Sequence, residues 1–239
     1  SVGVRPYVGV GALLSFSCLL KTNVCEGRRQ MIKKIPNSAL AVSEPNPSWF
    51  GNPGNEASNP NWTNKNWLKS RFHFSFAEYH NPSNTNFGVL RVLNDDLVQP
   101  MRGFGEHPHR DMEICTYVVE GSLTHKDSTG NHETIGRGAV QFMTAGRGVT
   151  HSEHNLDKSN ALRFMQIWIS PRQGGLPPNY GSYQGKPEER RNKWAHLVSD
   201  AAGSANTPIK INQDANLFVA EVEAGAAATL PLAADRQAY

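Results

Sequence analysis

Two short motifs in the middle of the chain carry residue types that bind metals. His107 and His109 are separated by one proline, and His151 and Glu153 are separated by one serine. Residues two apart on a β-strand point to the same face, so each motif presents two side chains together. Two such strands side by side would direct three imidazoles and a carboxylate at one point. Three neutral nitrogens and one anionic oxygen indicate a divalent transition metal rather than calcium or magnesium.

A third acidic residue leaves the identity of the carboxylate open. Glu113 has the same parity as His107 and His109, so it too is expected to face inward. Either Glu113 or Glu153 is the ligand, and the other is a nearby base or a structural acceptor. A purely structural alternative pairs the histidines with backbone or carboxylate groups and binds no metal. His154 has the opposite parity and is expected to face outward. Surface or packing roles are expected for the other histidines: His73, His80, His125, His132 and His196.

Short strands separated by turn-forming residues would position these side chains. Phe72, Phe74 and Phe76 alternate with period two, which is typical of a strand. Strands are expected over residues 71–76, 87–92, 112–119, 122–126, 139–143, 162–169 and 217–222, with a weaker candidate at 229–232. Turns are expected over residues 81–86, 94–96, 128–131 and 136–138. Short strands with glycine turns and no amphipathic helix predict an all-β fold, an antiparallel barrel or jelly roll.

Charge and cysteine usage limit the function classes. Residues 1–34 contain six basic residues and one acidic residue, a balance of +5, so the other residues carry −2 of the overall +3. The folded part therefore lacks the basic excess of a nucleic-acid-binding domain, and no direct nucleic-acid partner is expected. The three cysteines show no CxxC spacing, which argues against a disulfide framework, and Cys115 is expected to be a small buried thiol.

The first 61 residues are expected to be a leader followed by a disordered linker. Residues 8–20 are apolar with Arg5 ahead of them, which is too short for a membrane span but suits a targeting peptide. The alternative is that these residues are disordered or are an artefactual upstream translation, because Met31 would serve as a natural start of the protein. Residues 36–61 are rich in Pro, Asn, Ser and Gly without periodicity. A cytoplasmic or nuclear location and no membrane span are expected, with organellar or secretory targeting by residues 1–34 as the alternative.

Both metal-binding motifs resemble those of the pirin family, a branch of the cupin superfamily. Residues 103–113 read GFGEHPHRDME, and residues 144–153 read TAGRGVTHSE. Residues 72–76 are similar as well, and the resemblance spans roughly residues 66–171. In pirins, both histidines of the first motif and the His and Glu of the second hold the metal. The resemblance therefore implies four ligands here and favours Glu153 over Glu113: His107, His109, His151 and Glu153.

The same resemblance implies a domain organisation. Pirins have two facing cupin barrels, each a double-stranded β-helix, with the metal in the N-terminal one. Residues 62–171 then form the N-terminal barrel, residues 172–204 a linker, and residues 205–239 the beginning of a C-terminal barrel that is cut short. Residues 1–61 precede the first barrel.

The resemblance also implies alternative functions. The first is a quercetin 2,3-dioxygenase that cleaves a small aromatic polyphenol with O2. It would use Fe(II), with Mn, Ni, Co, Cu or Zn as other candidates, and Glu113 would be the catalytic base. The second is an iron- and redox-dependent co-regulator that binds a transcription-factor protein without turnover. A metal-stabilised barrel without turnover is the third.

Overall fold

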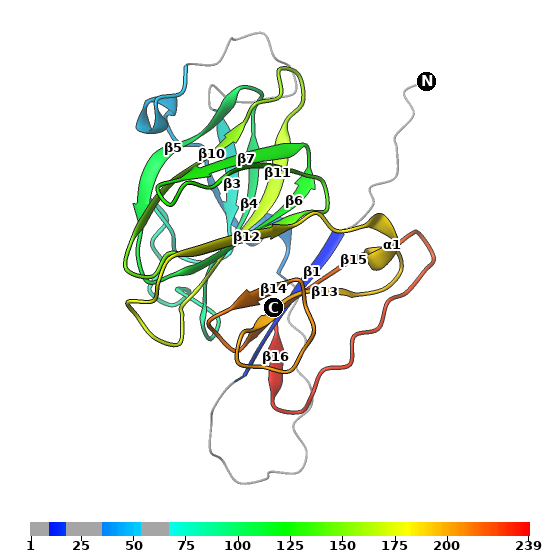
Figure 1. The fold of residues 1–239 in the computed structure, drawn as a ribbon. Helices are drawn as coiled ribbons and strands as arrows, with labels where there is room; N and C mark the ends of the chain where they lie inside the picture. The colour runs from blue at the N-terminus through cyan, green and yellow to red at the C-terminus, as the bar shows by residue number, and fades with distance from the viewer. Residues whose placement is uncertain (1–9, 18–34, 54–66) are drawn as a thin grey trace, which may run out of the picture.

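Three β-sheets make up the computed structural model, which describes residues 10–17, 35–53 and 67–239 (Figure 1). The seven-stranded sheet has the order β12-β9-β6-β11-β4-β3-β2. Its strands are β2 (Ala41–Ser43), β3 (Leu68–Phe72), β4 (Leu90–Val98), β6 (Glu113–Glu120), β9 (Val140–Thr144), β11 (Leu162–Ile169) and β12 (Asn179–Tyr183). The four-stranded sheet has the order β5-β10-β7-β8. Its strands are β5 (Arg102–His109), β7 (Ser122–Asp127), β8 (His132–Gly136) and β10 (Val149–Asn155).

These two sheets face each other and enclose the interior of a barrel. Apolar side chains fill one part of it, namely Trp67, Leu68, Val98, Val118, Leu123, Ile135, Ala139, Leu162 and Phe164. A smaller apolar cluster comprises Ile114, Met143 and Val149. Buried polar side chains are also present in the interior, and they include both members of the pair His151 and Glu153. The barrel therefore has apolar packing and a polar site.

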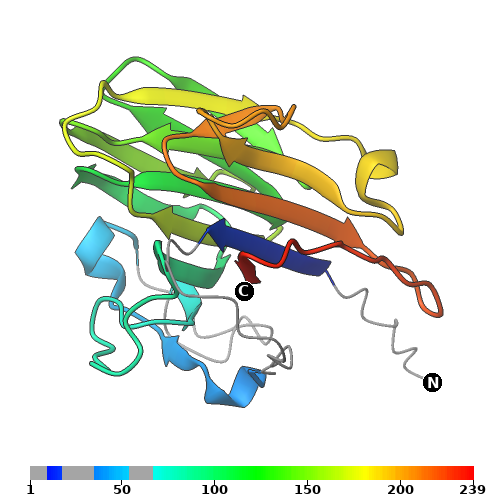
Figure 2. The same cartoon turned by 90° about the horizontal axis from the view of Figure 1, so that it is seen from below.

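A five-stranded sheet forms a third layer against the outer face of the seven-stranded sheet. Its order is β14-β13-β15-β1-β16, and Figure 2 shows β1 alongside β15. The strands are β1 (Val10–Ser17), β13 (Ala195–Asp200), β14 (Ile209–Ile211), β15 (Ala215–Glu221) and β16 (Arg236–Ala238). Side chains of both sheets, such as Tyr117 and Leu217, share one apolar core. The seven-stranded sheet is thus covered on both faces.

Strand β6 shows how the middle sheet serves two layers. Its first six residues are all buried. Cys115 and Tyr117 pack in the core shared with the five-stranded sheet, whereas Ile114 and Val118 pack in the barrel clusters. This alternation follows from the period of two along a strand. A near-continuous apolar run is typical of a strand covered on both faces.

The strand predictions agree best with the structure where the sequence is mostly apolar. The strand expected over residues 71–76 from alternating phenylalanines is largely wrong, because β3 ends at Phe72. The strand expected over residues 162–169 is β11 with the same bounds, and that over 112–119 is β6 within one residue. The turn expected over residues 94–96 is wrong, because these residues lie inside β4. Asn94 and Asp96 are buried, and Asp96 accepts a hydrogen bond from Ser70 Oγ. Consecutive polar residues resemble a turn in the sequence, but here Asn94 and Asp96 face a polar interior.

Parts of both predicted linkers form regular structure. Within residues 35–53 the chain forms 3-10 helices η1 (Asn37–Ala39) and η2 (Pro47–Phe50) as well as β2. Residues 54–61 lie outside the described residues, as does most of the predicted leader. Between residues 172 and 204 the chain forms β12, helix α1 (Pro187–Arg190) and all of β13. The linker assignments therefore do not describe these segments.

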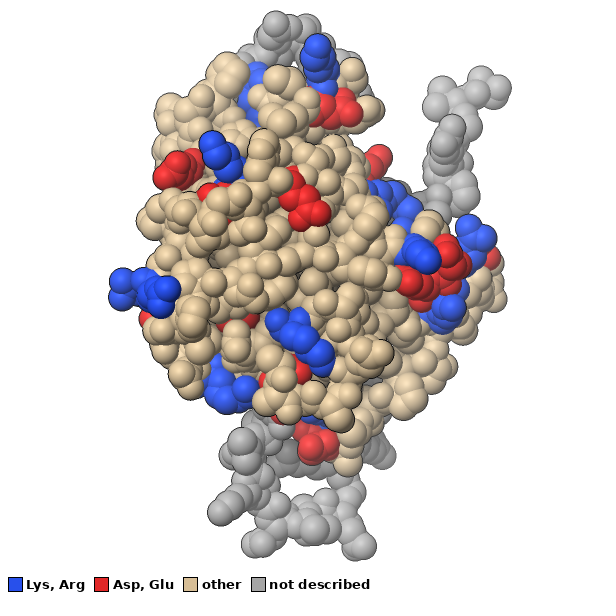
Figure 3. All heavy atoms as spheres, in the orientation of Figure 1, with Lys and Arg blue, Asp and Glu red and all other residues tan. Residues whose placement is uncertain are grey.

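Acidic and basic side chains are interspersed on the face seen in Figure 3. Near α1 both signs lie together, and Arg137 and Arg190 both contact Glu221 there. This face shows no continuous basic stripe of the kind that nucleic-acid binding requires. No helix among the described residues has the length and hydrophobicity to cross a membrane.

Candidate metal centre

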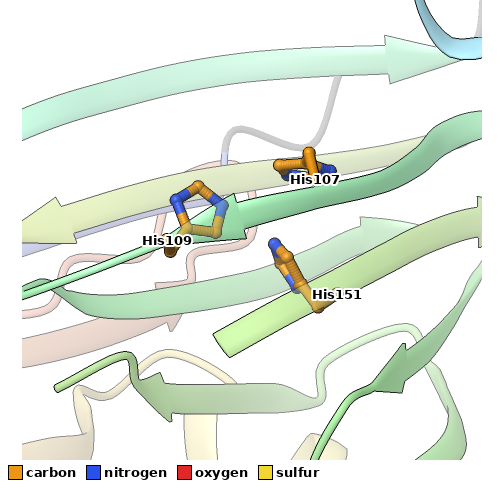
Figure 4. Close-up of side chains that lie close together, drawn as sticks. All are labelled: His107, His109 and His151. Atoms are coloured by element: carbon orange, nitrogen blue, oxygen red, sulfur yellow. The ribbon is translucent and has the colours of Figure 1, made fainter. Parts of the chain in front are cut away.

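Three histidine side chains converge at one point between β5 and β10 (Figure 4). One nitrogen from each of His107, His109 and His151 lies within 4.8 Å of the others. Two nitrogens bound to one ion at about 2.1 Å are at most about 4.2 Å apart. Only a small contraction therefore separates the observed cluster from three ligands on a common metal.

The hydrogen bonds of two rings leave one nitrogen of each available. His107 Nδ1 lies 2.7 Å from the backbone oxygen of Gly105. A carbonyl only accepts, so Nδ1 carries the proton and Nε2 keeps its lone pair. His151 Nε2 is buried and has no hydrogen-bond partner. A buried polar nitrogen without a partner is costly, and a metal ion at this point would satisfy it. The residues present therefore fit a metal.

Burial keeps two of these rings neutral. Desolvation, followed by the neighbouring imidazoles, lowers the pKa of His109 to about 3, and Glu153 opposes this shift. Desolvation and the rings of His107 and His125 lower the pKa of His151 to about 3, and Asp127 opposes that shift. A histidine binds a metal only through a neutral imidazole. These rings are therefore ready to bind at neutral pH without losing a proton.

Glu153 lies beside the histidines and is held by amide donors. The Nε2 atoms of Gln141 and Gln166 donate to its two carboxylate oxygens at 2.7 and 2.8 Å. Thr116 Oγ1 donates at 3.2 Å. A Glu153 oxygen groups with nitrogens of His151 and His125 within 4.8 Å. The carboxylate therefore borders the three-histidine cluster and has a fixed orientation.

Glu113 lies on the other face of β6. Thr116, which contacts Glu153, is three residues away, so the two side chains point to opposite faces. The Glu113 carboxylate accepts hydrogen bonds from Thr144 Oγ1 at 3.0 Å and from the backbone nitrogen and Nδ2 of Asn212, both at 3.2 Å. Burial raises its pKa. The structure does not bring Glu113 to the histidines, which argues against the expected catalytic role.

The register of β5 and β10 accounts for the convergence. His107 is opposite His151, but Phe104 rather than residue 105 is opposite Glu153, so β5 has one extra residue there. The strands approach closely beside this bulge. A Cβ atom at Gly103 would lie 2.3 Å from the backbone oxygen of Glu153, so no larger residue fits. Bulges commonly redirect side chains next to functional sites.

The N-terminal 3-10 helix η2 covers the exposed side of the cluster. Its last residue, Phe50, packs edge-on against the His107 ring at 5.5 Å. Asn52 exchanges two hydrogen bonds with the backbone of Gly103, at 2.8 and 3.0 Å. Trp168 packs edge-on against His109 at 4.7 Å. This cover was not predicted, because it depends on contacts between residues about fifty apart.

A further pair beside the site was also missed. His125, expected to have a surface or packing role, is only 1% exposed, and its Nε2 lies 2.9 Å from Asp127 Oδ2. Its Nδ1 lies 3.5 Å from His151 Nδ1. Hydrogen bonds from His125, Thr129 and Asn131 outweigh the effect of burial and lower the pKa of Asp127. The period-two spacing of His125 and Asp127 is the signal that would have found them.

The fold and the cluster together define a class of protein. Facing antiparallel sheets with inward histidines from two paired strands are the jelly roll of the cupins, here with a histidine cluster of transition-metal type. A family model described as Pirin matches residues 55–169. A pirin-like protein of Caulobacter vibrioides is 43% identical over 173 residues, covering 72% of this chain and 74% of its own. The chain belongs to the pirin family.

Two further similarities agree with this membership. A quercetin 2,3-dioxygenase of Escherichia coli K12 is 43% identical over 155 residues, covering 65% of each chain. The crystal structure of the bacterial pirin YhhW of Escherichia coli in complex with nickel(II) superposes with a TM-score of 0.57. It is 35% identical and covers 74% of this chain and 70% of its own.

Proposed function

We propose that this pirin is a metal-dependent dioxygenase of the quercetin 2,3-dioxygenase type, acting on a small aromatic polyphenol and O2. The convergence of His107, His109 and His151 around a buried nitrogen without a partner carries the proposal. The name of the E. coli relative supports the reaction, and the nickel(II) complex of YhhW supports metal binding by this chain.

The three histidines would hold the metal, and the Glu153 carboxylate beside them would be the anionic donor. Fe(II) is our first choice, because such a ligand set stabilises Fe(II) and permits Fe(III). Mn, Ni, Co, Cu and Zn remain alternatives, since the general binding order favours Cu and Ni over Fe. When bound, the metal supplies Lewis acidity and open coordination positions for substrate and oxygen.

The side chains around the cluster prepare the substrate. With Glu113 on the other face of β6, Glu153 is the carboxylate that we propose as acceptor of the substrate hydroxyl proton. The amides of Gln141 and Gln166 orient it, which reduces the reorganisation needed during proton transfer. Phe50 and Trp168 present aromatic surface next to the ligands and would limit access of water to them.

Metal-loaded protein tests the proposal directly. Fe(II)-loaded protein receives quercetin without oxygen, and oxygen is then admitted. We expect oxygen uptake with release of carbon monoxide and a depside. A His109→Ala variant should lose both metal and turnover. A His132→Ala variant, which changes an exposed histidine of β8, should keep both. Full metal loading without oxygen uptake would reject the dioxygenase proposal and leave a metal-stabilised barrel.

A co-regulator that binds a transcription-factor protein stays an alternative implied by the family resemblance. The names of the two relatives given above mention no protein partner. A pull-down with reduced, oxidised and metal-free protein would test it, and identical partners in all three states would reject a redox switch.

A further inference from the structure

A buried chain of one carboxylate and two imidazoles runs from the β7–β8 hairpin to the candidate metal centre. We propose that Asp127 and His125 are positioning residues that fix the tautomer of His151, so that His151 presents Nε2 to a metal. The inference rests on the proposed metal centre, but the tautomer of His151 is also defined in metal-free protein. It can therefore be tested there.

The first step is set by the carboxylate. Asp127 Oδ2 lies 2.9 Å from His125 Nε2, and both side chains are 1% exposed. An ionised carboxylate only accepts hydrogen bonds, so His125 Nε2 must carry a proton. A neutral imidazole has one such proton, which leaves His125 Nδ1 as an acceptor.

The second step passes this choice to the ligand. His125 Nδ1 lies 3.5 Å from His151 Nδ1, a long contact in which one nitrogen must donate. Because His125 Nδ1 is the acceptor, His151 Nδ1 carries the proton, and the lone pair of His151 is on Nε2. That atom is the one found buried without a partner. Two independent observations thus select the same nitrogen.

The turn between β7 and β8 holds the start of this chain in place. Asp127 Oδ1 accepts hydrogen bonds from the backbone nitrogen and hydroxyl of Thr129 at 2.9 and 2.7 Å, and from the backbone nitrogen of Asn131 at 3.1 Å. The ring of Tyr180 stacks on His125 with centroids 4.4 Å apart. Both features restrict rotation, so the hairpin orients a ligand that belongs to another strand.

An Asp127→Asn variant tests the tautomer with little change of shape. The Asn oxygen can keep the turn, while its amide faces His125 Nε2 as a donor. His125 must then carry its proton on Nδ1, and His151 must move its own to Nε2. The same substitution beside a catalytic histidine produces the wrong tautomer. We expect nitrogen-15 NMR of metal-free protein to show reversed protonation of His151, and the Kd for Ni(II) to rise roughly 10- to 100-fold.

Matched variants separate positioning from charge and folding. Glu133→Gln removes another carboxylate of the same hairpin, which bonds Tyr180 and Ser182, and should leave the His151 tautomer unchanged. His125→Gln keeps an acceptor towards His151 and a donor towards Asp127, so it should bind Ni(II) nearly as wild type. His125→Leu removes both and should bind as weakly as Asp127→Asn. Thermal melting reports whether each variant folds.

The outcomes are distinct. An unchanged His151 tautomer in folded Asp127→Asn, or equal Ni(II) affinities for His125→Leu and His125→Gln, would overturn the proposal. If Asp127→Asn fails to fold, the two His125 variants decide. If wild-type protein binds no Ni(II), the proposed metal centre is wrong. The tautomer of His151 in metal-free protein still tests whether Asp127 and His125 position that ring.

Discussion

The two buried glutamates differ in which donors reach them. Glu153 receives the amides of Gln141 and Gln166 inside the barrel, and Glu113 receives Thr144 and Asn212 towards the third layer. Each is 2% exposed or less. Sequence parity could not separate them, because it relates residues within one strand and Glu113 begins a new one after a turn. The strand assignment, not the residue type, decides the face.

Replacing each glutamate by glutamine should separate their roles. Glu153→Gln removes the anionic metal donor and places an amide opposite the amide groups of Gln141 and Gln166. The Kd for Ni(II) should therefore rise roughly tenfold or more. Glu113→Gln should leave this Kd within about twofold. It should reduce stability by about 1–3 kcal/mol, because the new amide NH2 would face the hydrogen-bond donors of Thr144 and Asn212. Metal titration and urea unfolding measure the two effects. Loss of Ni(II) binding by folded Glu113→Gln would contradict the assignment.

Metal-free protein should lose stability on acidification through its cluster. His109 and His151 have folded pKa values of about 3 against an ordinary 6.5. Between these values the unfolded chain binds protons that the folded state does not, so stability is complete above pH 6.5 and falls towards pH 3. Urea unfolding at pH 7.5, 6 and 5 would measure this.

The pH dependence of wild-type stability must be compared with that of a variant, because Asp96 changes stability with pH in the opposite direction. Desolvation raises the pKa of Asp96 to about 7. Its contribution is therefore greatest at low pH and is lost as pH rises from its ordinary value through 7. The decline in metal-free His109→Asn should be shallower than in wild type. Equal slopes for the two proteins would contradict the expectation for His109.

At the scale of elements, the β5–β10 pair depends on a close approach at Gly103. An Ala there would place Cβ 2.6 Å from the His154 Cα atom and closer still to Glu153, and both obstacles are backbone. We expect Gly103→Ala to cost about 1–3 kcal/mol and to weaken Ni(II) binding, because β10 must shift. Gly136→Ala in β8 meets nothing closer than 3.7 Å and is the control. Equal effects of the two would refute the argument.

The cover formed by η2 gives a second prediction for an element. Phe50 contacts Trp67 and Phe104 as well as His107. Phe50→Ala should speed Ni(II) dissociation and cost less than the about 3–5 kcal/mol typical of a fully buried Phe, since Phe50 is half-buried. The neighbouring Trp49 is 61% exposed, so Trp49→Ala should change neither. Dissociation rates from chelator competition, if equal for both variants, would exclude a covering role.

The sequence predicted the elements that have a strong apolar run and missed those that depend on distant partners. The strand at 162–169 is mostly apolar and was found with its bounds. Asn94 and Asp96 resemble turn residues, and only the polar barrel interior explains their place in β4. Residues 47–52 show no periodicity in the sequence. Their structure depends instead on contacts with β5, about fifty residues later. The strand pattern alone left the fold open between an antiparallel barrel and a jelly roll, and the family resemblance decided between them.

At the scale of the whole molecule, a buried ion pair connects the barrel with the third layer. Arg190 is 2% exposed, donates to Glu221 of β15 at 2.8 Å, and fills the space above Gly138. Arg190→Met should destabilise the protein by less than the about 3–5 kcal/mol of a fully broken buried pair, because Arg137 still contacts Glu221.

The adjacent arginine provides the control for this prediction. Arg191 is largely exposed and lies 3.9 Å from Glu223, so Arg191→Met should change stability by about 0–1 kcal/mol. Urea unfolding measures both variants, and Ni(II) affinity should be unchanged in each. Similar stability losses for the two arginines would show that burial of Arg190 does not matter.

Burial of β6 on both faces determines where the chain can change in length. One residue inserted into or deleted from β6 would exchange its faces, sending Thr116 towards the third layer and Cys115 towards Glu153. Polar and apolar partners would then be mismatched on both sides at once. The exposed stretch 223–227 has no such constraint. Length variation among relatives should therefore accumulate in such loops, while the number of residues in β6 stays constant.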